Sequence, residues 1–174
     1  AAFYGAAHQQ PQQFSVLSIL PALRDTTKKD IRINFVITRK DIPRSWLKSF
    51  KTENGLVQVS SPELTAADLI TNYKVVGGLN RVATVLNELA ESLDFSKLNN
   101  DFFEYVPKSS IQRLGYLLEQ PLAQNNLADT LYEKAQKSNC KFQQIPLKYT
   151  NKTENCEIDP KWKIIINEQI EIDE

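Results

Sequence analysis

Apolar residues recur at every second position early in the chain and at every third or fourth position further on, so the sequence predicts strands followed by helices. Residues 13–20, which follow Pro11, are rich in apolar side chains and predict a strand buried on both faces. A half-exposed strand is predicted next, because apolar side chains alternate there with the polar Arg32, Asn34 and Thr38. The apolar set is Ile31, Ile33, Phe35 and Ile37. Asn54-Gly55 is typical of a turn, and residues 56–60 predict the next strand of a small sheet.

Helical spacing dominates the middle of the chain. Ser60-Ser61-Pro62-Glu63 predicts a helix start, with a serine cap, a proline in the first turn and a glutamate that reaches back to a free amide. Gly77-Gly78 predicts a break before a second helix. Each of these two helices has an apolar face, made of Leu64, Ala67 and Ile70 in the first and of Leu79, Val82, Ala83, Leu86, Leu89 and Leu93 in the second. Residues 109–120 and 126–137, separated by Pro121, predict a helical hairpin within residues 109–138.

The end of the chain returns to a strand pattern. Residues 142–149 predict a weak strand, and residues 162–172 predict a stronger one with Ile164, Ile166, Ile170 and Ile172 on one face. Strands at both ends of the chain around helices indicate an α+β fold, with a small mixed β-sheet packed with about four or five helices. We expect residues 1–174 to form a single domain.

Residues 4–12 have a composition that no hydrophobic period explains. They contain the single histidine of the chain, His8, followed by Gln9 and Gln10, which make a candidate functional surface. We expect His8 to be a capping or surface residue rather than a general base. Because the chain begins with Ala and contains no Met, we expect it to be the C-terminal part of a longer protein.

Several function classes are disfavoured by composition. No apolar run approaches the roughly 18 residues that a bilayer-spanning helix needs, so we expect no membrane partner. Cys140 and Cys156 lack CxxC spacing and partner histidines, which favours two reduced thiols over a disulfide and argues against structural zinc. We predict no metal site and no cofactor.

Charge is unevenly distributed although the net charge is zero. Residues 1–60 hold nine Lys/Arg against four Asp/Glu, which predicts one electropositive face. The best nucleic-acid-binding candidates are the cations of a dense cluster: Arg39, Lys40, Arg44, Lys48 and Lys51. They could neutralise phosphates while the interleaved Trp46 and Phe50 pack against sugar or base. Alternatively, the cluster is a solvated loop that its aromatic residues anchor to the core, and the sequence leaves both interpretations open.

Two weaker signals have structural explanations that we favour. Arg81 follows Gly77-Gly78 at a helix N-terminus, where free amides can bind an anion, but a tight turn also requires glycines there. Glu63 and Asp68 resemble a carboxylate pair, yet a helix-start charge and an exposed turn explain them better. No nucleophile elbow or phosphate-binding loop is present, so we assign no catalytic residue and expect no enzyme activity.

A family resemblance rests on five segments that occur in one order: Tyr-Gly-Ala-Ala-His-Gln-Gln-Pro-Gln (4–12), Ser-Pro-Glu-Leu-Thr-Ala-Ala-Asp-Leu-Ile (61–70), Gly-Gly-Leu-Asn-Arg-Val-Ala-Thr-Val-Leu-Asn-Glu-Leu (77–89), Gln-Arg-Leu-Gly-Tyr-Leu-Leu-Glu (112–119) and Trp-Lys-Ile-Ile-Ile-Asn (162–167). This set resembles the AbiEi antitoxins of type IV toxin–antitoxin, or abortive infection, systems. The resemblance implies a bacterial, cytoplasmic, autoregulating transcriptional repressor whose C-terminal domain supports antitoxin activity and auxiliary DNA contact.

The same resemblance implies two partners. One is the DNA of the protein's own promoter, bound mainly by an N-terminal winged helix-turn-helix that we expect to lie outside these 174 residues. The other is a nucleotidyltransferase-like toxin, which the antitoxin opposes without needing to bind it. Two alternatives remain open, a nuclease-like enzyme acting on nucleic acid and a dimerisation module that spaces two winged helices over half-sites.

Overall fold

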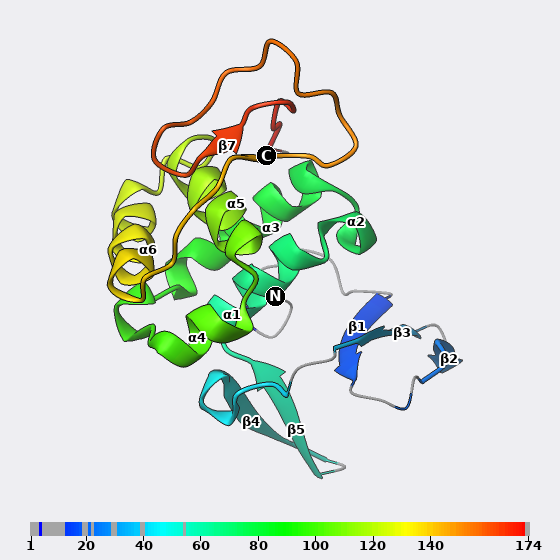
Figure 1. The fold of residues 1–174 in the computed structure, drawn as a ribbon. Helices are drawn as coiled ribbons and strands as arrows, with labels where there is room; N and C mark the ends of the chain where they lie inside the picture. The colour runs from blue at the N-terminus through cyan, green and yellow to red at the C-terminus, as the bar shows by residue number, and fades with distance from the viewer. Residues whose placement is uncertain are drawn as a thin grey trace.

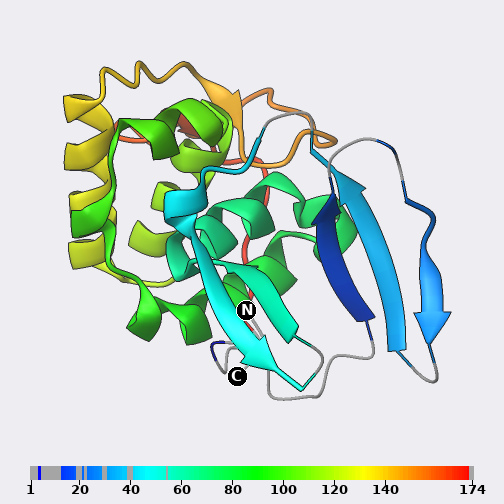
Figure 2. The same cartoon turned by 90° about the horizontal axis from the view of Figure 1, so that it is seen from below.

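The computed structural model describes residues 4, 13–18, 21, 23–28, 31–38, 41–53 and 55–172. A body of helices is flanked by small sheets from the first third of the chain, and the C-terminal segment runs over the opposite side of that body (Figures 1 and 2). This arrangement confirms the predicted α+β class.

The first sheet has three strands, β1 (Gln13–Ser18), β2 (Thr26–Lys28) and β3 (Ile31–Ile37), in the order β1-β3-β2. β1 runs parallel to β3 and β2 runs antiparallel to it, so the sheet is mixed, as predicted. The predicted burial was wrong in two respects. β1 is not buried on both faces, because Val16 is 40% exposed, and in β3 the terminal Ile31 and Ile37 are exposed whereas the central residues are partly buried.

A second sheet is the hairpin of β4 (Leu47–Thr52) and β5 (Gly55–Ser60), which pair antiparallel. The prediction of a turn at Asn54-Gly55 and a strand after it is confirmed for the described residues. However, β5 does not join β1 and β3, because its hydrogen-bonding partner is the basic segment β4.

The helices are α1 (Pro62–Thr71), α2 (Tyr73–Val76), α3 (Leu79–Leu89), α4 (Asn100–Tyr105), α5 (Lys108–Glu119) and α6 (Asn125–Lys137), with 3-10 turns at Arg44–Trp46, Ala90–Ser92 and Phe95–Lys97. The four predicted helices are therefore confirmed, and α5 packs against α6 as the predicted hairpin requires. The predicted face of the second helix is buried, although α3 ends at Leu89, so that Leu93 reaches the core from beyond a 3-10 turn.

Local chemistry explains where α1 and α3 begin. The Ser61 hydroxyl caps α1 by accepting a hydrogen bond from the Leu64 amide at 3.3 Å, with Pro62 in the first turn. Gly77 and Gly78 have φ angles of 108° and 97°, which side chains disfavour, and they allow the turn into α3. Glu63 does not reach back to its own helix start, because its carboxylate accepts a hydrogen bond from the Asp94 amide at 3.0 Å.

Helix α5 is the centre of the fold, since residues 110–118 are all buried. Gly115 lies where the indole of Trp162 packs, and a Cβ atom at this glycine would lie 2.1 Å from the ring. Trp162 is itself fully buried and donates a hydrogen bond from Nε1 to Glu119 at 2.5 Å. The close approach of backbone and ring therefore requires glycine at position 115.

The C-terminal arm, residues 142–172, contains far less strand than the sequence predicts. Its only strands are β6 (Ile145–Pro146) and β7 (Ile164–Ile165), which pair in parallel, and one isolated antiparallel bridge joins Ile158 to Ile165. The rest of residues 142–149 and 162–172 is not regular strand. The alternating isoleucines do face the core, with Ile164 buried and Ile166, Ile170 and Ile172 packed beside it. Their alternation reflects burial of one side of the segment rather than sheet formation.

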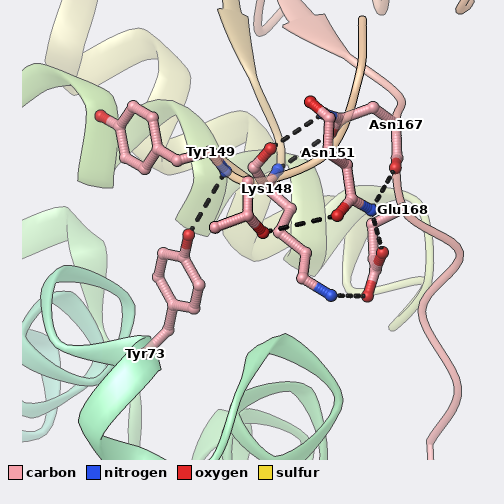
Figure 3. A network of polar contacts seen from close by, with 7 residues as sticks. Tyr73, Lys148, Tyr149, Asn151, Asn167 and Glu168 are labelled. Atoms are coloured by element: carbon pink, nitrogen blue, oxygen red, sulfur yellow. Dashed lines mark hydrogen bonds and ion pairs between the residues drawn. The ribbon is translucent and has the colours of Figure 1, made fainter.

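Side-chain hydrogen bonds replace the missing strand pairs. From α5, the buried Gln112 donates to the carbonyls of Gln143 and Trp162, both at 2.7 Å, and Arg113 donates to those of Leu147 at 2.9 Å and Pro146 at 2.6 Å. Further out, Asn167 exchanges two hydrogen bonds with the Lys148 backbone, and Glu168 binds the Lys148 ammonium at 2.6 Å (Figure 3). The hydrogen bonds of Gln112 and Arg113 to the arm explain why this Gln-Arg pair occurs in segment 112–119.

A partly buried carboxyl lies where the sheets meet the helices. Asp68 is in the interior of α1, not in an exposed turn as predicted, and it accepts a hydrogen bond from the Ser60 hydroxyl at 3.5 Å. Burial raises the Asp68 pKa to about 7, an effect that the hydrogen bond from Ser60 opposes.

The first prediction concerns Gly115. Gly115→Ala forces the Trp162 ring out of its site, so we expect a loss of about 3 kcal/mol in the free energy of unfolding, measured by urea denaturation. The exposed helical control Gln136→Ala should change that free energy by less than about 0.5 kcal/mol. A Gly115→Ala variant as stable as the wild type would contradict the packing described.

The second prediction concerns Asp68. Its pKa is about 7 in the folded protein, whereas in the unfolded chain it is about 3.9, so its contribution to stability is full at low pH and is lost as the pH rises through about 7. Asp68→Asn stays neutral and avoids this loss. We expect the free energy of unfolding of the variant, relative to the wild type, to rise by about 1.4 kcal/mol per pH unit between about pH 4 and pH 7. A difference that is constant over this range would show that Asp68 is not protonated in the folded protein.

Candidate nucleic-acid interface

The β4–β5 hairpin, residues 47–60, projects from the helical body and carries most of the described cations of the basic cluster (Figures 1 and 2). We call it the ribbon. Its base is fixed by Trp46, which is 7% exposed and packs edge-on against Phe102 of α4 with ring centroids 5.3 Å apart. The Ser61 amide also donates to the Trp46 carbonyl at 2.7 Å, which joins the first residue before β4 to the cap of α1.

The two lysines of the ribbon lie on opposite faces. Lys48 pairs with Val59 and Lys51 pairs with Leu56, and residues three apart in a strand point to opposite sides. One face of the ribbon therefore carries Lys48 with Phe50 and Val57. The other face carries Lys51 with Leu56. The cluster does not form a single positive surface.

The cations of the ribbon and of the turn before it are available for an external partner. Arg44, in the 3-10 turn before β4, is exposed, as are Lys48 and Lys51, and none of the three forms an ion pair with a described residue. Trp46 anchors the segment to the core, as the interpretation of a solvated loop held by its aromatic residues predicts. The lysines remain in solvent, as the interpretation of phosphate binding requires. The segment of residues 44–51 thus combines the two alternatives that the sequence left open.

Tyr4 contacts the base of the ribbon. Its hydroxyl donates to the Ser60 carbonyl at 2.7 Å, and the Lys48 ammonium lies 5.6 Å from its ring centroid. Burial raises the Tyr4 pKa, and the negative charge of Glu63 raises it further. The first residue of segment 4–12 therefore packs beside the residues that begin segment 61–70, which sequence reasoning did not foresee.

Arg81 belongs to a different element from the ribbon. It is exposed in the first turn of α3, behind a turn that the Gly78 amide closes by donating to the Tyr73 carbonyl at 2.7 Å. No side chain caps this helix, and its first turn carries no acid. The tight turn explains both glycines, and anion binding at Arg81 stays a prediction.

Five residues of the predicted sites lie outside the described part of the chain: His8, Gln9, Gln10, Arg39 and Lys40. Their roles stay predictions. Sequence reasoning also missed that residues 47–52 form a strand and that Leu56 and Val57 of the ribbon are exposed, at 72% and 41%. The apolar Leu47 and Phe50 are three residues apart and show no strand alternation, so the Asn54-Gly55 turn signal was the available indication of a hairpin.

The described residues also bear on metal and membrane sites. Within the described residues, no group of three or more His, Cys, Asp or Glu side chains is placed to hold a metal ion. Likewise, none of the helices in that part of the chain has the length and apolar character to span a bilayer. Cys140 and Cys156 are free thiols, as predicted.

Comparison with known proteins gives one match. A family model described as the AbiEi antitoxin C-terminal domain matches residues 1–120, which include the three-stranded sheet, the ribbon and helices α1 to α5. Neither the curated proteins nor the solved structures contain a significant match. The chain belongs to the AbiEi antitoxin C-terminal domain family, and thus to the antitoxins and transcriptional regulators of abortive-infection toxin–antitoxin systems.

Proposed function

We propose that this domain assists a cytoplasmic type IV antitoxin in repressing its own promoter, with the ribbon contacting the DNA backbone. In this proposal the complete gene product selects the operator, and the domain adds affinity through Arg44, Lys48 and Lys51. Such phosphate contacts are independent of sequence and weaken as salt increases. The proposed partners are promoter DNA and a nucleotidyltransferase-like toxin, which the antitoxin opposes without direct binding.

The observation that carries this proposal is the projecting ribbon, whose cations lack acidic partners among the described residues. Its base is held by Trp46 and Ser61, so the backbone next to the cations is fixed at that end before a partner binds. Family membership supports the regulatory role.

A nuclease-like function receives less support from the same structure. Its best candidates were Glu63 and Asp68, and both have structural roles. Glu63 holds the Asp94 amide, and Asp68 lies in the interior of α1 beside Ser60. We therefore propose a binding role without catalysis.

The third prediction tests the cations of the ribbon and of the turn before it. Arg44→Ala combined with Lys51→Ala in the complete gene product should lower affinity for the DNA upstream of its own gene and leave operator preference unchanged. Removing two phosphate contacts should reduce the slope of log affinity against log salt by about 1.8. Binding isotherms at several salt concentrations measure both quantities.

A charge-matched control separates a local contact from an effect of net charge. Lys152→Ala combined with Lys163→Ala removes two exposed lysines from the C-terminal arm. Figure 1 shows this arm on the side of the helical body away from the ribbon. This control should retain the wild-type slope. Equal slopes in the ribbon variant and the wild type would remove the ribbon from the DNA contact.

A further inference from the structure

The ribbon has the shape and side chains of an element that enters a groove. Each of its strands has six residues, so the ribbon is about 20 Å long, and it is joined to the body at one end only. The major groove of B-DNA is about 12 Å wide and about 8.5 Å deep, and it admits a two-stranded ribbon. Lys48 and Lys51, on opposite faces, would then each face one wall of the groove and reach phosphates of both DNA strands.

The far end of the ribbon carries groups that phosphate binding does not explain. Leu56, beside the turn, is 72% exposed, and Glu53 is exposed and forms no ion pair with a described residue. A carboxylate opposes phosphate binding, but it can accept a hydrogen bond from the cytosine N4 amino group. An apolar side chain can contact the thymine methyl group. Both base groups lie in the major groove.

From these observations we infer that the ribbon enters the major groove of the operator, where Leu56 contacts a thymine methyl group and Glu53 faces a cytosine amino group. The inference rests on the proposed function and goes beyond it, because it gives this domain a part in reading sequence. It also selects DNA over RNA, since the major groove of A-form RNA is too narrow for a ribbon and uracil lacks the methyl group.

The experiment replaces thymine by uracil, one position at a time, in the DNA upstream of the gene. Binding is measured for the complete gene product and for its Leu56→Ala variant. For the wild type we expect at least one position where the loss of the methyl group lowers affinity about fourfold, the equivalent of one buried methylene-sized group. For Leu56→Ala the same replacement should change affinity by less than about 1.5-fold. Because Leu56 is exposed, its truncation leaves the core intact.

Val75→Ala is the matched control, because Val75 is an exposed apolar residue of α2. It should keep the full uracil penalty. Equal penalties in the wild type and in Leu56→Ala, with operator-selective binding retained, would overturn the groove assignment and leave the proposed function standing. Absence of selective binding by the wild type would overturn both. If Leu56→Ala instead changes the sedimentation of the protein without DNA, the ribbon is an interface between two copies, and the assignment is wrong.

Discussion

Burial of helix α5 is the constraint on which the rest of the structure depends. Because α5 is enclosed along residues 110–118, other elements must pack around it, and contacts reach it from α1, α3, α6 and the C-terminal arm. Polar residues inside such a helix are tolerated only when they are fully hydrogen-bonded. Gln112 and Arg113 meet this condition by binding backbone carbonyls of the arm, so the same residues also hold the C-terminal arm in place.

The position of the ribbon follows from this core. Helix α1 packs on α5, and its cap residue Ser61 holds the Trp46 carbonyl, while the Trp46 ring packs on Phe102. The ribbon therefore leaves a rigid base and extends into solvent with its cations and Leu56 exposed. These exposed side chains are the groups on which the DNA-contact proposal rests.

The sequence predicted the features that local chemistry controls. The Ser61 cap, the Gly77-Gly78 break and the separation of α5 from α6 near Pro121 each depend on residues a few positions apart. It failed where the outcome depends on distant neighbours. The isoleucines of residues 162–172 alternate because one side of this segment packs on helices. Alternation shows that one side is buried, but it does not show whether a helix or a strand covers that side. Trp46 appeared equally suited to core or ligand, because Phe102 is far along the chain.

The central claim, that the ribbon lies against promoter DNA, is tested most directly by attaching a DNA-cleaving iron chelate to the ribbon. Ser49→Cys in a Cys156→Ser background places an exposed thiol on the ribbon for the chelate, since Cys140 is buried. The account predicts cleavage confined to a short stretch of the operator, and no cleavage from a chelate at Lys152→Cys on the opposite side. Cleavage from position 152 but not from position 49 would contradict it.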